Sequence, residues 1–178
     1  MYGGDMKGVI IYQSKYGSTK RYSEWLSEET GFDCIETRKA RIEDIKQYDI
    51  VILGGGVYAS GIAGLSFLKK YKHQLSGKKI IVFCVGASPY DENAFKQIVA
   101  HNMKDSLVGI PCFYCRGAWD MDNMNVVDRN LCKLLRKAVA KKDPNKYEIW
   151  EKALVSAGDE KCDWTDKSYI VPILEAIK

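Results

Sequence analysis

Ser14-Lys15-Tyr16-Gly17-Ser18-Thr19 follows the apolar run 8–12 and precedes a segment with the apolar spacing of an amphipathic helix. A strand that leads through such a turn into a helix presents free backbone N–H groups, and the helix dipole favours negative charge there. The hydroxyls of Ser14, Ser18 and Thr19 add donors, and Gly17 lets the backbone approach a ligand closely. The stretch therefore predicts a phosphate-binding turn, although it has neither the Walker A ending nor the three spaced glycines of a dinucleotide fingerprint.

Around this turn, apolar runs alternate with helical patterns. Strands are expected at about 8–13, 32–37, 49–54, 79–85 and 111–115. Helices are expected at about 19–29, 42–47, 65–75 and 91–103. Because right-handed crossovers join strands that alternate with helices, the pattern predicts a parallel sheet covered on both faces. Ligands of such sheets bind at the carboxyl ends of the strands.

The pattern changes after the fifth expected strand. A basic helix is expected over about 126–141, followed by a polar stretch over 142–161 and a last helix that ends near Ile177. Because a proline inside a helix is costly, Pro172 requires the last helix either to start late, near Ser168, or to kink.

Length and composition bound the class of protein. The 178 residues suit one domain, residues 1–178, with a disordered lead-in over residues 1–6 and an insertion over about 120–162. No apolar run approaches the roughly 20 residues that span a bilayer. The N-terminus also lacks the apolar region of a signal peptide, so we expect a cytoplasmic protein.

The net charge of +4 comes from a basic excess concentrated between Arg129 and Lys152. The simplest interpretation is a solvated helix face. The alternatives are peripheral docking of residues 129–152 on a membrane surface or on an acidic partner. Nucleic acid is not expected as a partner, because no recognition module accompanies the charge.

The six cysteines are expected as reduced thiols. Cys112 and Cys115 have the spacing of redox and zinc sites, but residues three apart on a strand point to opposite faces. We therefore expect no metal. His73 and His101 are expected on helix surfaces, and no side chain stands out as a catalytic acid or base.

Two further loops follow expected strand ends. Residues 54–61 read Gly-Gly-Gly-Val-Tyr-Ala-Ser-Gly, and residues 85–92 read Val-Gly-Ala-Ser-Pro-Tyr-Asp-Glu. Each loop offers glycine-containing backbone and one aromatic ring, Tyr58 or Tyr90. Backbone groups can hold the edges of a flat ligand and aromatic rings its faces. Together with the phosphate turn, the loops predict a site for a planar ring joined to a phosphate.

With these three loops the chain resembles the flavodoxin-like FMN-binding proteins, and within them the branch that contains the flavodoxin-like protoporphyrinogen dehydrogenase. The resemblance to that branch rests on the stretch 116–120, Arg-Gly-Ala-Trp-Asp, on the basic helix, and on the stretch 163–166, Asp-Trp-Thr-Asp. It implies a three-layer α/β sandwich with a five-stranded parallel sheet of order 2-1-3-4-5 and FMN at the carboxyl edge of that sheet.

The resemblance also implies which residues bind FMN. The phosphate would be bound by Ser14, Tyr16, Gly17, Ser18 and Thr19. One side of the ring would be lined by Gly56, Val57, Tyr58 and Ala59, and the other by Gly86, Ala87, Ser88, Pro89 and Tyr90. Trp119 would either cover an exposed edge of the ring or pack in the core under the insertion.

The expected function is electron transfer through bound flavin, with a redox partner protein or a small-molecule donor or acceptor. The alternative is a flavin-dependent protoporphyrinogen or quinone oxidoreductase, although the loop after Tyr58 lacks the histidines that this branch can carry there. A receiver domain is disfavoured, because Gln13-Ser14 and Gly54-Gly55 stand where acidic residues would be needed. A flavin-free binding module stays open.

Overall fold

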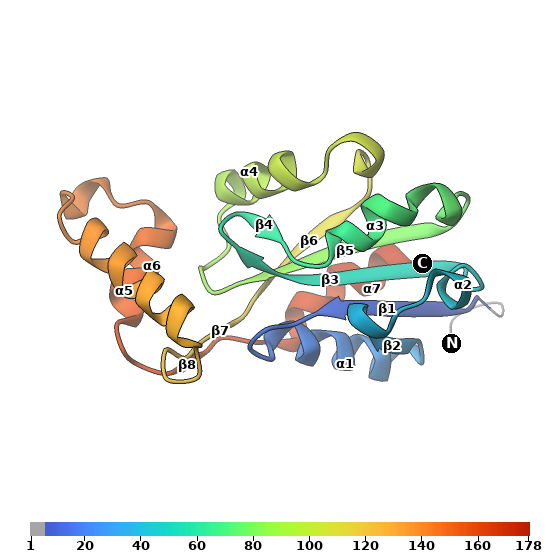
Figure 1. Ribbon diagram of the computed structural model, residues 1–178, viewed down its shortest axis with the longest axis horizontal. Helices are drawn as coiled ribbons and strands as arrows, with labels where there is room; N and C mark the ends of the chain where they lie inside the picture. The colour runs from blue at the N-terminus through green and yellow to red at the C-terminus, as the bar shows by residue number, and fades with distance from the viewer. Residues whose placement is uncertain (1–5) are drawn as a thin grey trace.

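A parallel sheet forms the centre of the computed structural model, which describes residues 6–178 (Figure 1). Its five main strands are β1 (Gly8–Gln13), β2 (Asp33–Glu36), β3 (Ile50–Tyr58), β5 (Lys79–Gly86) and β6 (Cys112–Arg116). They lie in the order β2-β1-β3-β5-β6, and every neighbouring pair is parallel. The predicted order 2-1-3-4-5 is therefore confirmed. Of the expected lead-in over residues 1–6, all but Met6 lies outside the described residues.

Helices cover both faces of the sheet. One face carries α1 (Ser18–Thr30) and α7 (Val171–Ile177). The other carries α2 (Ile42–Ile45), α3 (Leu65–Tyr71) and α4 (Glu92–Asn102). Short 3-10 turns extend or join these elements at Thr37–Lys39, Lys72–Leu75 and Asp105–Leu107.

The core lies in two layers, one on each side of the sheet. Successive residues of a strand point to opposite faces, so Val9 packs in one layer and Ile10 in the other. Burial of both faces explains why β3 and β5 each contain a continuous apolar run. Cys112 and Cys115 also pack in different layers, which confirms their predicted placement on opposite faces.

The last helix starts late. A 3-10 turn over Lys167–Ile170 precedes it, and α7 begins at Val171 rather than near Ser168. Pro172 therefore lies in the first turn of α7, where a missing backbone N–H breaks no helical hydrogen bond.

The chain between β6 and α7 forms a helical lobe, residues 120–161, which projects beyond the carboxyl ends of the sheet (Figure 1). It contains α5 (Val126–Val139), a 3-10 turn (Pro144–Lys146) and α6 (Ile149–Ala157). At its base, β7 (Ala118–Trp119) pairs antiparallel with β8 (Cys162–Asp163). In the part of the chain described, no helix is long and apolar enough to cross a bilayer.

Helix α6 corrects the expectation of a polar stretch over 142–161. A capping box between Glu148 and Glu151 starts this helix. Its apolar residues Leu154 and Ala157 pack with Trp119, Met121 and Val139 in a small core of the lobe. The helix was missed because it is short and its many charged neighbours mask the apolar spacing.

Candidate functional site

A cleft of about 310 Å³ opens between the carboxyl ends of β1, β3 and β5 and the helical lobe. Among the residues that line it are Ser14, Tyr16, Ser18, Thr19, Gly56, Val57, Tyr58, Ala59, Gly86, Ala87 and Trp119. These come from the three predicted loops and from β7. The loops meet because parallel strands end at the same edge of the sheet.

The phosphate turn leaves the N-terminus of α1 open. Gly17 is the N-cap residue, with a φ of 100° that favours glycine, and its N–H donates to Ser14 Oγ at 3.1 Å. No side chain caps α1, and its first turn carries no acidic residue. By contrast, Asp91 caps α4 and Asn125 caps α5. The first-turn N–H groups of α1 are thus available to an anion.

The second loop is a strained hairpin turn. Tyr58 and Gly61 pair across the hairpin of β3 and β4 (Gly61–Ile62), and the two residues between them have positive φ values, 46° at Ala59 and 66° at Ser60. Such turns normally carry glycine or asparagine, because other residues are strained there. The turn must therefore be held by its surroundings.

Asn102, at the end of α4, holds this turn. Its buried side-chain amide accepts a hydrogen bond from Ile62 N at 2.9 Å and donates to Ser60 O at 2.6 Å. The sequence analysis did not identify Asn102. Its only sequence signal was an amide at the end of an otherwise apolar helix face.

The third loop turns part of its length away from the cleft. Tyr90 is 53% exposed and packs against Phe95 and Tyr114, with ring centroids 5.8 and 6.0 Å away. The Tyr114 hydroxyl donates to Ser88 O at 2.6 Å and fixes the loop in that course. Gly17, Ser88, Pro89 and Tyr90 lie outside the cleft lining, so their contact with a ligand stays a prediction.

The helical lobe and its base form the remaining wall of the cleft. The residues that the sequence analysis did not assign to it are Val85, Gly117, Ala118, Met124, Asp128, Leu131, Cys132 and Leu135. Most follow β6, and no local pattern shows how that segment folds back on the sheet. Trp119 lines the cleft and also packs in the lobe core, and its cover of a bound ring stays a prediction.

A charged contact joins the lobe to the phosphate turn. Asp128 on α5 forms an ion pair with Lys15 and accepts a hydrogen bond from the Tyr16 hydroxyl. The bond from Lys15, followed by that from Tyr16, holds the pKa of Asp128 below its usual range. Lys15 Nζ also lies 5.7 Å from the centre of the Tyr58 ring. One cation therefore stands beside both the phosphate turn and the second loop.

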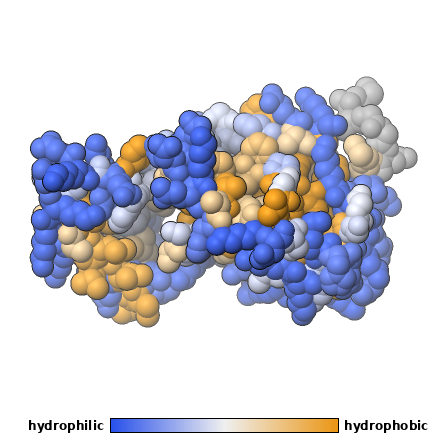
Figure 2. Space-filling view, turned by 90° about the horizontal axis from the view of Figure 1, so that it is seen from above, coloured by the Kyte–Doolittle hydropathy of each residue, from blue (hydrophilic) through white to orange (hydrophobic). Residues whose placement is uncertain are grey.

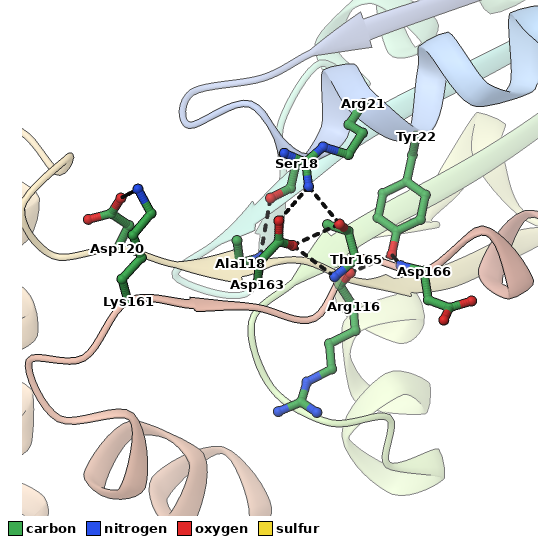
Figure 3. A network of polar contacts seen from close by, with 10 residues as sticks. All are labelled: Ser18, Arg21, Tyr22, Arg116, Ala118, Asp120, Lys161, Asp163, Thr165 and Asp166. Carbon is green, nitrogen blue, oxygen red and sulfur yellow. Dashed lines mark hydrogen bonds and ion pairs between the residues drawn. The ribbon is translucent and has the colours of Figure 1, made fainter.

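A second set of polar contacts ties the base of the lobe to α1 (Figure 3). Arg21 pairs with Asp163 at 2.5 Å and donates to Thr165 at 2.7 Å. The Tyr22 hydroxyl accepts from Asp166 N at 3.1 Å, and burial raises the pKa of this phenol. The stretch 163–166 thus positions the phosphate-turn helix.

A family model described as a flavodoxin domain matches residues 9–146. Among solved structures, the chain is similar to a flavodoxin from the domain Archaea, with 15% identity over 72% of this chain and 92% of the other and a TM-score of 0.40. It is also similar to a WrbA-like flavodoxin from Agrobacterium tumefaciens, with 19% identity, coverage of 70% and 88% and a TM-score of 0.46. No curated protein matches. The chain belongs to the flavodoxin domain family.

Proposed function

We propose that this chain is an FMN-binding redox protein that transfers electrons through flavin held in the cleft. The observation that carries the proposal is the uncapped N-terminus of α1, which shares one cleft with the glycine-containing loops after β3 and β5. Membership of the flavodoxin domain family supports flavin as the ligand. The electron donor and acceptor would be a redox protein or a small molecule.

The residues of the cleft fit a flavin phosphate. The volume of the cleft, about 310 Å³, is at the lower end of the roughly 300–1,000 Å³ of small-molecule sites. A Cβ at Gly56 would lie 2.7 Å from the Tyr58 hydroxyl, and one at Gly86 would lie 2.7 Å from that of Tyr114. A side chain at either position would therefore displace the tyrosine ring that packs against it.

Two hydroxyls of the phosphate turn accept backbone hydrogen bonds and keep their own protons free to donate. Ser14 Oγ accepts from Gly17 N, and Ser18 Oγ accepts from Ala118 N at 3.2 Å. Because a hydroxyl that accepts one bond can still donate its own proton, both can bind phosphate oxygens. Lys15 adds positive charge nearby.

FMN, when bound, supplies the electron chemistry. The chain's own residues bind and orient the cofactor. The backbone of residues 56–59 would hold an edge of the ring, and the Asn102 amide would keep that backbone in its strained turn. Trp119 would exclude water from the side of the ring that faces the helical lobe.

A specific feature favours a second candidate, an FMN-dependent oxidoreductase for an apolar acceptor such as a quinone. Leu131 and Leu135 line the cleft and are also exposed beside it, so the wall formed by the lobe is apolar. Turnover of a quinone by the reduced protein, compared with electron exchange with a reductase, would separate this enzyme from an electron carrier.

The first experiment is a visible absorption spectrum before and after FMN is added. Bands at roughly 375 and 450 nm that stay with the protein through gel filtration are expected of bound flavin. Riboflavin, which lacks the phosphate, should bind at least about tenfold more weakly if the N-terminus of α1 binds that phosphate. A protein that ignores excess FMN would contradict the proposal.

Gly17→Ala tests the turn itself, with Gly77→Ala as the matched control. Both glycines have positive φ, 100° and 77°, and open space around an added Cβ, so both variants should lose about 1 kcal/mol of stability. Only Gly17→Ala should weaken FMN binding and reduce the preference for FMN over riboflavin. Equal loss of FMN binding in both variants would show that the effect is not local to the turn.

A further inference from the structure

Helix α5 carries an apolar stripe that the protein does not cover. Val127 is 75% exposed, Leu131 50% and Leu134 65%, and their spacing places them on one side of the helix. Val139 is the buried residue of α5. Figure 2 shows hydrophobic side chains gathered on one side of the helical lobe. A helix in a globular domain ordinarily packs such a stripe against the core, so this one is free to contact something else.

A row of free cations runs beside the stripe. Lys133, Lys137 and Lys141 follow one another at intervals of four residues, are exposed, and form no ion pair with the residues described here. Other cations of this segment are already paired, Arg136 with Asp159 and Lys142 with Glu151. The positive charge of the row is therefore uncompensated.

The residue types on this surface of α5 indicate which kind of partner it binds. Aliphatic side chains beside lysines are typical of helices that lie in the plane of a membrane interface. Protein interfaces are depleted in lysine, and in a twofold dimer the same patch of a second copy would oppose this one, lysine row against lysine row. We propose that α5 docks on the surface of a bilayer that contains anionic phospholipids, with its apolar stripe in the headgroup region and its lysines on lipid phosphates.

Docking would also determine what reaches the cleft. Leu131 belongs to the stripe and lines the cleft, so α5 on a bilayer would place the cleft mouth at the lipid boundary. This step rests on the proposed function. A lipid-soluble redox compound would then reach the cofactor without crossing water, whereas a water-soluble one would find the mouth obstructed.

The test is co-sedimentation of the full chain with vesicles of equal parts phosphatidylcholine and phosphatidylglycerol, at low and at high salt. Binding should exceed that to pure phosphatidylcholine and weaken at high salt, because charge screening reduces attraction to anionic headgroups. Replacing Lys133, Lys137 and Lys141 by glutamine should weaken binding roughly 100-fold, since each lysine near an anionic surface contributes about fivefold. Val127→Ser with Leu134→Ser should weaken it at least about tenfold.

Matched controls separate the surface from general charge and apolarity. Lys39, Lys69 and Lys104 are exposed lysines of the sandwich, and their replacement by glutamine removes the same charge. Val108, 70% exposed and outside the lobe, is the control for Val127. Neither control should change vesicle binding.

Several results would overturn the proposal. They are failure of the full chain to bind the anionic vesicles at low salt, equal loss in the control and α5 variants, or concentration-dependent dimers that Val127→Ser with Leu134→Ser abolishes. FMN absorbance of the same variants tests the proposed function separately, because neither Val127 nor Leu134 lines the cleft. A protein that binds the anionic vesicles but does not bind FMN would contradict the proposed function and leave the docking surface supported.

Discussion

The sandwich and the helical lobe use apolar residues in opposite ways. Helix α1 buries Tyr22 and Leu26 against the sheet, whereas α5, of similar length, buries Val139 and exposes Leu131 and Leu134. The sheet has large apolar layers on both faces, while the lobe core has five buried members, of which Trp119 and Leu154 remain partly accessible. Apolar side chains therefore stabilise the fold in the sandwich, and in the lobe many of them line the cleft or form a surface.

The largest difference between the two regions is expected for a leucine-to-alanine substitution, measured by the free energy of unfolding. Leu53 is fully buried in β3, so Leu53→Ala should lower the free energy of unfolding by about 2–5 kcal/mol. Leu134→Ala, on the exposed stripe of α5, should change it by less than about 0.5 kcal/mol. Urea unfolding of both variants measures the difference. Similar losses would mean that α5 is packed in solution, against the exposure described here.

Asn102→Ala should show that the sandwich also holds the second loop. The variant leaves Ile62 N–H and Ser60 C=O without their buried partner, which should cost about 1–3 kcal/mol of stability. FMN should bind more weakly because the strained turn at Ala59 and Ser60 loosens. Asn93→Ala, at an exposed position of the same helix, is the control for urea unfolding and FMN titration. An unchanged FMN affinity would remove Asn102 from the positioning of the site.

Acid should loosen the lobe before the sandwich. Glu151, 1% exposed, is bonded to Lys142 at 2.5 Å, and this bond, followed by that from Glu148 N, lowers its pKa. Its stabilisation is thus present above about pH 4.3, the ordinary value for glutamate, and is lost as pH falls through the lowered pKa. As pH falls through that range, hydrogen exchange of the α6 amides, corrected for intrinsic rates, should accelerate at a higher pH than exchange of the β3 amides. In Glu151→Gln this acid sensitivity of α6 should disappear. If it persists, a group other than Glu151 causes it.

The smallest effect is expected at the junction of the two regions. Lys15 stands beside the phosphate turn and stabilises negative charge there, so Lys15→Gln should lower the flavin reduction potential, on the order of 10 mV for an exposed charge. Lys39→Gln, on the sandwich, is the control. A potential that stays unchanged or rises in Lys15→Gln would mean that Lys15 does not stabilise negative charge at the site.

Local patterns sufficed for most of the sandwich. Most strand bounds and the meeting of three loops were predictable because apolar runs and turn residues report on nearest neighbours in the chain. The strand order was implied by the family resemblance, and β3 continues to Tyr58, beyond its expected end at residue 54. The position of Tyr90 was not predictable from local patterns. The loop after β5 is fixed by the Tyr114 hydroxyl, which comes from the next strand. Asn102 was missed for the same reason, because its partners lie about 40 residues earlier.

The sequence by itself determined the layers, the glycine-containing turn before α1 and the basic character of α5, because these depend on residue type and short spacing. Only the tertiary structure decided that α6 exists as a helix of the lobe, that Asp128 reaches Lys15 and Tyr16, and that α5 turns Leu131 toward both cleft and solvent. The physical reason is that helix amphipathicity shows which side of a helix is apolar. It does not show whether that side meets a core, a ligand or a membrane, which depends on long-range packing.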